Sequence, residues 1–377
     1  MMKTKIFALC LCAAAAFLSS CGHGVRTVSG YDDAISFIGR VDKTDSLGPR
    51  QWGAGAYFTF AFDGAGCDID LRDERLYGTS YNYLEVVIDG QSAGRFRTLG
   101  AQNRLTIGQT PSPAVADTAV KVIAVADSLA PGRHTVLIAR DTESAMGYTQ
   151  LCSVSAPGLE KWQPETRLKM EFIGNSITSG MDCYTDEIPY GQGVWYDRHR
   201  AYYAYGPRAA RALGAEWSLA SVSGIGLMHS CCDHKYVMPQ IYDKVDLVDN
   251  KIGYDFAYQP DVVVCALGQN DGEQDSTAFA TAYVDFIRMI SERNVNADIA
   301  LISSPMANDT LRAYFRKMLP AISAEAEAQG LAGKSGAIPF HIYEKSYNGG
   351  GSDHPSMDEQ AVIADELVAF LREAFSL

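Results

Sequence analysis

Residues 170–183 have the sequence MEFIGNSITSGMDC, in which an apolar run stops at small, turn-forming residues. A short apolar run bounded by turn residues indicates a buried strand. In an open parallel sheet, binding and catalytic groups gather just beyond the carboxyl ends of such strands. Ser176 stands at that position, so it is either a reactive group or a polar residue that only ends the strand.

Further apolar runs follow this stretch and alternate with helical patterns. The strand candidates are residues 168–174, 216–224, 261–269, 298–305 and 337–344, and the helix candidates are residues 204–214, 276–293, 311–330 and 358–375. Alternation of this kind predicts a parallel sheet covered by helices on both faces. We therefore predict a three-layer α/β domain of the flavodoxin-like kind over residues 167–377.

The preceding residues, 28–156, have a different pattern of residue types, which is typical of short strands. Short segments rich in Val, Ile, Tyr, Phe and Thr are separated by Gly, Pro, Asp and Asn, and no long helical pattern interrupts them. We predict an all-β sandwich of the jelly-roll type over this range. Two prolines, a glycine and several polar residues lie within residues 157–166, which we interpret as a linker.

The first 20 residues have the layout of a secretory signal. Lys3 and Lys5 precede an apolar run over residues 6–18, which is too short to span a bilayer as a permanent helix. Cys21 follows at a point that resembles the cleavage site of a bacterial lipoprotein; the alternative is an ordinary secretory signal with an incidental cysteine. We expect a cell-envelope lipoprotein that touches the membrane only through its lipid, by default in the outer membrane facing the periplasm or the surface.

Composition narrows the possible partners. The formal net charge is -13 at pH 7, and no dense Lys/Arg cluster offsets it, which disfavours nucleic acid and anionic lipid as partners. Neutral substrates such as sugars remain compatible. The segment HSCCDH, residues 229–234, lacks the cysteine spacing of a zinc site, so we expect no metal.

Six cysteines follow Cys21, and disulfides are allowed outside the cytoplasm. The sequence does not choose among the complete pairings. We expect a disulfide between Cys183 and either Cys231 or Cys232, because both loops follow neighbouring predicted strands. Cys265 lies inside an apolar run and is predicted to be a buried free thiol.

Small or polar residues follow the predicted strands of the α/β domain. Ser176 follows the first strand, Gly224 ends the second, Asn270 follows the third, and His354 comes after the last. A serine becomes a nucleophile when an imidazole removes its proton. The N–H groups of Ser176 and Gly224 and the amide of Asn270 would stabilise an oxyanion, with Gly226 as the alternative to Gly224. The pattern predicts acyl transfer with Ser176 as nucleophile and His354 as base.

The segments GNS, SVSG, GQND and DHP, in this order, resemble the four blocks of the SGNH (GDSL-like) hydrolases. With the β domain in front and the segment YQPDVVVCALGQND, residues 258–271, the chain is similar to carbohydrate esterase family 2, whose members remove acetyl groups from xylan, glucomannan and related glycans. The resemblance implies a carbohydrate acetyl esterase that works through an acetyl-enzyme intermediate, needs no cofactor and takes an acetylated poly- or oligosaccharide.

Two positions depart from the resembled pattern. Asn175 replaces the usual Asp of the first block, and Gly351 stands where an Asp often precedes the histidine by three residues. Asp353 adjoins His354, and neighbouring side chains on an extended segment point apart, so Asp353 is a weak candidate for a third triad member. We expect a Ser–His dyad in which a main-chain carbonyl orients the imidazole, as in some members of the resembled family.

Two further expectations concern the surroundings of the site. Aromatic residues crowd the segment after the first block, and Trp195 and Tyr196 are the candidates for stacking on a sugar ring. Asp271 is predicted to hold its own loop through backbone N–H groups.

Two other functions remain compatible with the sequence. One is a different ester hydrolase of the same fold, such as a lipase, thioesterase or aryl esterase, which acyl-chain preference would distinguish. The other is a glycan-binding lipoprotein with an inactive hydrolase domain, against which the presence of Ser176, Asn270 and His354 argues. The β-sandwich is either a carbohydrate-binding module or a wall of the active site.

Overall fold

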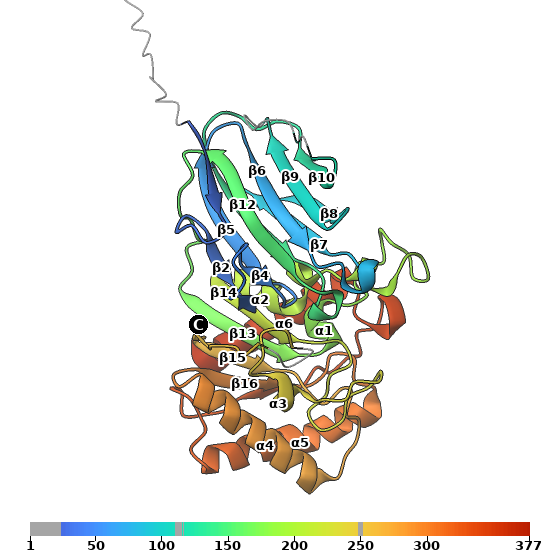
Figure 1. Cartoon of the computed structure of the whole chain (residues 1–377). Helices are drawn as coiled ribbons and strands as arrows, with labels where there is room; N and C mark the ends of the chain where they lie inside the picture. The colour runs from blue at the N-terminus through green and yellow to red at the C-terminus, as the bar shows by residue number, and fades with distance from the viewer. Residues whose placement is uncertain (1–23, 110–114, 116, 248–251) are drawn as a thin grey trace, which may run out of the picture.

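The computed structural model describes residues 24–109, 115, 117–247 and 252–377. The predicted signal segment, residues 1–20, and the predicted lipidation site Cys21 lie outside these ranges. An all-β domain comes first and an α/β domain follows it, drawn one above the other in Figure 1. Within the described ranges, no helix is long and apolar enough to cross a membrane.

Two sheets form the β domain, as the sequence predicted. One has the order β10-β9-β6-β12-β4-β3, with β1 paired to β12, and the other has the order β2-β5-β11-β7-β8. The pairings are antiparallel except for that between β9 and β10. The strands are β1 (Val25–Ser29), β2 (Ser36–Ile38), β3 (Val41–Asp42), β4 (Arg50–Gln51), β5 (Tyr57–Asp63), β6 (Gly66–Asp73), β7 (Tyr83–Ile88), β8 (Gln91–Arg97), β9 (Gln102–Gly108), β10 (Val120–Ala126), β11 (Arg133–Arg140) and β12 (Thr149–Pro157).

Strand β5 shows how alternation divides its side chains between two cores. Phe58, Phe60 and Phe62 pack between the two sheets of the sandwich. Tyr57 belongs instead to a core shared with the α/β domain, because successive strand residues point to opposite faces. The sandwich therefore buries one face internally and part of another against the second domain.

One fully parallel sheet forms the centre of the α/β domain, with the order β14-β13-β15-β16-β17. Its strands are β13 (Leu168–Gly174), β14 (Ala215–Ser221), β15 (Val262–Cys265), β16 (Asp298–Ile302) and β17 (Phe340–His341). All five predicted strands are present, and the later ones end earlier than predicted. The chain turns where small or polar residues replace the apolar run, as at Ser223 after β14.

Helices cover both faces of this sheet, as predicted. They are α1 (Ser176–Ser179), α2 (Tyr205–Ala212), α3 (Met238–Ile241), α4 (Ser276–Arg293), α5 (Asp309–Ala328) and α6 (Met357–Phe375), and short 3-10 turns are η1 (Leu76–Gly78), η2 (Ser144–Met146), η3 (Trp195–Arg198), η4 (Ala201–Tyr203) and η5 (Gly351–Asp353). In Figure 1, α4 and α5 lie on the face away from the sandwich. Helices α2 and α6 pack on the opposite face, in the core that also holds sandwich residues.

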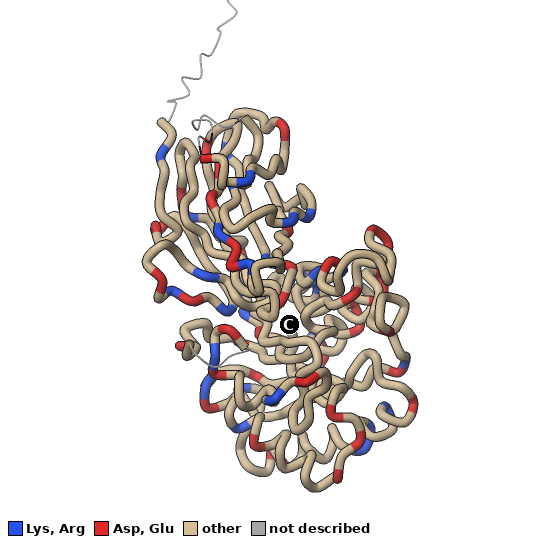
Figure 2. Tube along the Cα trace, turned by 45° about the vertical axis from the view of Figure 1, so that its right-hand side comes forward, with Lys and Arg blue, Asp and Glu red and all other residues tan. Residues whose placement is uncertain are grey.

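Buried ion pairs join the two domains. Arg40 of the sandwich is fully buried and pairs with Glu171 of β13 at 3.2 Å. Arg200 of the α/β domain pairs with Glu85 of β7 at 2.9 Å. Basic and acidic residues are otherwise scattered over both domains (Figure 2), so the negative formal charge is spread over the chain.

The predicted disulfide between Cys183 and Cys231 or Cys232 is wrong. Cys231 and Cys232 are bonded to each other, and Cys183 is a buried free thiol. The Cys183 sulfur packs 3.7 Å from the sulfur of Met357 at the start of α6, so it is held against a different element. Cys265 is buried and free, as the sequence predicted.

Candidate active site

The turn after β13 places Ser176 at the carboxyl edge of the sheet. Gly174 ends the strand, and a side chain there would collide with Thr178. Asn175 then caps α1, since its side-chain oxygen accepts a hydrogen bond from the N–H of Ile177 at 3.1 Å. Asn175 thus turns the chain, and Ser176 begins the helix.

His354 contacts Ser176, although the two residues are 178 positions apart in the sequence. The Nε2 atom of His354 lies 2.7 Å from the Oγ atom of Ser176, and the Nδ1 atom lies 2.8 Å from the carbonyl oxygen of Ser352. Ser352 and Asp353 have φ angles of 48° and 57°, a left-handed turn that brings this carbonyl back onto the imidazole. A proton on Nδ1 that is donated to the carbonyl leaves Nε2 free to accept from Ser176.

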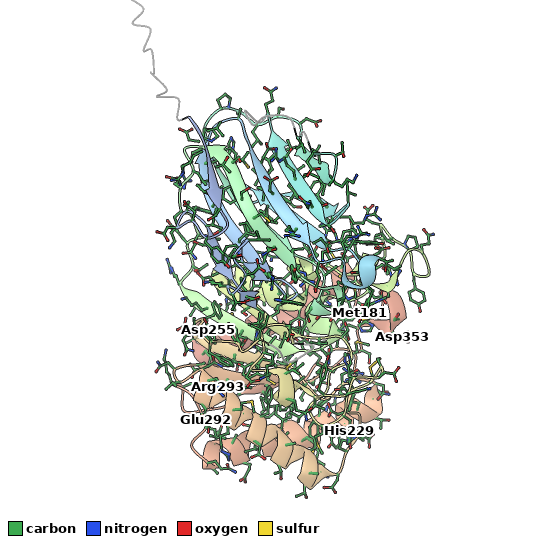
Figure 3. The ribbon with its side chains drawn as sticks, viewed as in Figure 1. Met181, His229, Asp255, Glu292, Arg293 and Asp353 are labelled. Atoms are coloured by element: carbon green, nitrogen blue, oxygen red, sulfur yellow. A yellow bond between two sulfur atoms is a disulfide. The ribbon has the colours of Figure 1, made fainter. Side chains whose placement is uncertain are left out.

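A main-chain carbonyl therefore occupies the place that a carboxylate takes in a Ser-His-Asp triad. This is the arrangement predicted from the sequence. Asp353, the alternative third member, is exposed. It is not among the residues that line the pocket around Ser176 and His354. Figure 3 labels Asp353 on the same side of the molecule as Met181, which does line the pocket.

The surroundings of His354 lower its pKa below the ordinary value. Burial disfavours the charged imidazolium, and His199 adds to this effect. The hydrogen bond to Ser352 and the charge of Asp182 oppose it and are outweighed. The imidazole is consequently neutral at neutral pH, which is the state that can accept a proton.

Gly224 and Asn270, the other predicted oxyanion-hole residues, line the same pocket. Gly224 has a φ of 84°, and a side chain there would come within 3.0 Å of the Cys231 sulfur. The Asn270 amide donates one hydrogen bond to the carbonyl of Ile225 at 2.7 Å and retains a second N–H. Gly226, the alternative, already donates its N–H to the Ser230 hydroxyl at 3.0 Å.

Asp271 is structural and binds backbone N–H groups, as the sequence predicted, but these N–H groups belong to the loop after β14 and not to its own loop. Its carboxylate accepts from the N–H groups of Leu227 at 2.9 Å, Met228 at 2.6 Å and His229 at 2.9 Å. These bonds connect the loop after β15 to the loop after β14. They hold together the two segments that carry Asn270 and Gly224.

The pocket has a volume of about 460 Å³. The polar site residues just described line one part of it, and apolar residues line the rest. Trp195, Met181 and Met306 contribute to the apolar part, as does the Cys231–Cys232 disulfide. The second predicted sugar contact, Tyr196, is buried, does not line the pocket and packs with its ring 5.1 Å from that of Tyr81.

Several residues that line this pocket were not predicted as site residues. Glu143 and Ala145 come from the β domain, and His234 comes from the loop after β14. Residues 140–145 of the β domain have no pattern that marks a site, and the HSCCDH segment suggested a disulfide or a metal site but no role for His234. In the described ranges, no group of three or more His, Cys, Asp or Glu side chains could hold a metal ion.

Known carbohydrate esterases resemble this chain in sequence. The family model for the carbohydrate esterase 2 N-terminal domain matches residues 37–115. The cellulase/esterase CelE of Acetivibrio thermocellus is 26% identical over 348 residues, which cover 90% of this chain and 39% of CelE. An acetylxylan esterase / glucomannan deacetylase of Cellvibrio japonicus is 23% identical over 393 residues, which cover 98% of each chain.

A solved structure has the same arrangement of both domains. It is a family two carbohydrate esterase from Clostridium thermocellum in complex with cellohexaose, and it superposes with a TM-score of 0.76 at 22% identity. The match covers 91% of this chain and 99% of that one. The resemblance to carbohydrate esterase family 2 thus extends over the N-terminal domain and over the fold of the whole chain.

Proposed function

We propose that this chain, which has the N-terminal domain and the fold of carbohydrate esterase family 2, is a serine esterase that removes O-acetyl groups from glycans. The observation that carries the proposal is the 2.7 Å contact between Ser176 Oγ and His354 Nε2. Relatives named acetylxylan esterase / glucomannan deacetylase support an acetylxylan- or glucomannan-type substrate.

The first half of the reaction forms an acetyl-enzyme. His354 Nε2 takes the hydroxyl proton of Ser176 while Oγ attacks the carbonyl carbon of the acetyl group. The carbonyl oxygen becomes an oxyanion, which the N–H groups of Ser176 and Gly224 and the amide of Asn270 stabilise. The imidazolium then donates its proton to the departing sugar oxygen, and the C–O bond to the sugar breaks.

The second half releases acetate. A water molecule gives a proton to His354 Nε2 and attacks the acetyl carbon, which regenerates the oxyanion in the same place. Collapse of the intermediate breaks the bond to Ser176, whose oxygen recovers the proton from the imidazolium. Ser352 holds the ring throughout, since its carbonyl accepts from Nδ1 in both protonation states.

The pocket walls suit a neutral sugar carrying a small ester. Trp195 is 38% exposed and lines the pocket, so its ring can cover the apolar face of a sugar. We assign sugar contact to Trp195 and not to Tyr196, which is buried behind it.

The experiment that tests this function is acetate release from acetylated xylan and acetylated glucomannan by the wild type and by Ser176→Ala. The proposal expects release by the wild type and its loss in the variant, and the preferred polymer then identifies the substrate. Cleavage of long acyl esters without acetate release would favour a lipase or thioesterase. Glycan binding without turnover of any ester would favour an inactive binding protein.

We also propose that the chain is anchored at the cell envelope through a lipid on Cys21. The short apolar run over residues 6–18 and the LSSC sequence that follows it support this placement. Cys21→Ala should move the protein from the membrane fraction to the soluble fraction of its bacterial host. Equal recovery of both forms with membranes would contradict the anchor.

A further inference from the structure

Glu143 is a carboxylate of the β domain that reaches the edge of the active site. It stands directly before η2, in the segment after β11, and its side chain is fully buried. One oxygen accepts from the backbone N–H of Ser223 at 2.6 Å, across 80 residues of sequence. The other lies 3.1 Å from Nε2 of His199, which is also fully buried.

Ser223 immediately precedes Gly224, the predicted oxyanion donor. The carbonyl of Ser223 and the N–H of Gly224 belong to one planar peptide group and point in opposite directions. His234 Nε2 lies 2.7 Å from that carbonyl, and Cys231 N–H donates to the carbonyl of Gly224 at 2.8 Å. Glu143 holds the N–H of Ser223, which belongs to the peptide group before this one. The contacts made by Glu143, His234 and Cys231 therefore together set the direction of the Gly224 N–H.

Both carboxylate oxygens of Glu143 are engaged, and the side chain has no exposed surface. Glu143 is therefore not a sugar contact, although it borders the pocket. Burial disfavours its ionised form, but the hydrogen bonds and charge from His199 and the bond from Ser223 outweigh burial and lower its pKa. An ionised acceptor holds a backbone N–H more firmly than a neutral one does.

We propose that Glu143 is a positioning residue for the oxyanion hole, and that through it the β-sandwich forms part of the catalytic site. The proposal rests on the proposed esterase function. It implies that the α/β domain carries the nucleophile and the base but depends on the sandwich to orient Gly224.

The matched control is Glu85, a second fully buried carboxylate of the sandwich. It pairs with Arg200 of the α/β domain at 2.9 Å, so it also joins the domains, and its other oxygen accepts from Ser92 of β8, so both hydrogen bonds go to residues outside the loop that carries Gly224. Glu143→Gln and Glu85→Gln each neutralise one buried carboxylate at the domain interface. Only Glu143→Gln weakens the hydrogen bond that the N–H of Ser223 donates.

The test measures kcat and KM for 4-nitrophenyl acetate and the melting temperature of the full chain in wild-type, Glu143→Gln, Glu143→Ala and Glu85→Gln forms. We expect Glu143→Gln to lower kcat by about 10- to 100-fold with KM within about twofold, because an oxyanion donor acts in the transition state. Glu85→Gln should lower the melting temperature similarly and keep kcat within about twofold. Equal kcat losses in Glu143→Gln and Glu85→Gln, or wild-type kcat in Glu143→Gln, would overturn the proposal.

A second measurement separates this proposal from the proposed function. Diethyl 4-nitrophenyl phosphate phosphorylates an activated serine, and its phosphoryl oxygen occupies the oxyanion hole. We expect Ser176 to be labelled about tenfold or more slowly in Glu143→Gln than in Glu85→Gln, even if the wild type cleaves no acetylated glycan. That pattern supports the positioning role while rejecting the substrate assignment. Equal labelling rates, or no labelling of wild-type Ser176, would reject the positioning role.

Discussion

At the scale of single residues, the chemistry depends on the protonation state of His354. The imidazole must be neutral to accept the Ser176 proton, and burial holds its pKa below the ordinary value of about 6.5. The carbonyl of Ser352 supplies orientation without supplying a full negative charge. A carbonyl stabilises the imidazolium less than a carboxylate would, and the imidazole with its lowered pKa stays a neutral base in mildly acidic solution.

The activity should therefore persist below the pH at which an ordinary histidine becomes charged. As pH falls through the lowered pKa, His354 takes up a proton and kcat/KM falls; above that pH the imidazole is neutral and the rate is maintained. A pH profile of kcat/KM for 4-nitrophenyl acetate should show one acidic limb with a midpoint below about 6.5. A midpoint above that value would contradict the buried, neutral imidazole.

Asp353→Asn should leave catalysis almost unchanged. Asp353 is exposed, and the Nδ1 atom of His354 is already held by Ser352. We expect kcat within about twofold of the wild type, whereas loss of a true triad carboxylate costs about 10⁴. His354→Ala, measured in parallel, should abolish turnover. A loss of a thousandfold or more in Asp353→Asn would restore Asp353 to the triad.

At the scale of elements, the loop after β14 is the part of the site with the most unusual covalent structure. The Cys231–Cys232 disulfide lines the pocket, and the Cys231 N–H donates to the carbonyl of Gly224 at 2.8 Å. Cys232 and Asp233 have φ angles of 61° and 66°, so the loop reverses sharply after the first cysteine. The disulfide fixes this reversal beside the predicted oxyanion hole.

Reduction of this disulfide should change catalysis more than stability. The bond closes a loop between adjacent residues, so it removes little entropy from the unfolded chain. We expect a reductant to lower kcat/KM by about three- to tenfold and to change the melting temperature little, because the Gly224 carbonyl loses a fixed donor. Mass spectrometry of the intact chain would verify reduction.

The double variant Cys231→Ser/Cys232→Ser is the control for this prediction. Its kcat/KM should match that of the reduced wild type, and reductant should have no further effect on it. An unchanged kcat/KM in both the reduced wild type and the double variant would show that the loop keeps its shape without the bond.

At the scale of the whole molecule, the two domains share one apolar core. Tyr57, Val87 and Leu137 of the sandwich pack in the same cluster as Phe172 and Trp217 of the α/β domain. Such a shared core favours a single cooperative unfolding transition over two separate ones. Glu143 reaches the oxyanion loop across this interface, so the proposed catalytic geometry depends on the domains staying together.

Arg40 gives a test of this coupling. Its guanidinium is fully buried, pairs with Glu171 at 3.2 Å and stacks 4.0 Å from the centre of the Tyr254 ring. Arg40→Ala leaves Glu171 buried without this partner, and breaking such a pair costs about 3–5 kcal/mol of unfolding free energy. Denaturant unfolding followed by intrinsic tryptophan fluorescence measures the change.

Arg133→Ala is the matched control, because its pair with Glu160 has both side chains 53% exposed. Exposed pairs contribute little, so its unfolding midpoint should stay near that of the wild type. A midpoint for Arg40→Ala that also stays near the wild-type value would show that the buried pair does not hold the domains together.

Much of the architecture was predictable from local patterns. Hydrophobic periodicity distinguishes a two-sheet sandwich from an alternating α/β domain because each pattern records which face of an element is buried. The same patterns predicted that Ser176, Gly224, Asn270 and His354 follow strands of one sheet, and the structure brings these four residues to one pocket. Turn-forming residues mark strand ends locally, so their approximate positions needed no knowledge of the tertiary fold.

Side-chain partners across the fold were not predictable in this way. Glu143 meets Ser223 across 80 residues, and Cys231 bonds to Cys232 while Cys183 packs on Met357. Tyr196 resembles Trp195 in the sequence, yet the first is buried against Tyr81 and only the second lines the pocket. These contacts depend on how two domains and several loops pack against one another. Hydrophobic periodicity records which face of an element is buried, but it carries no information about which distant residue that face will meet.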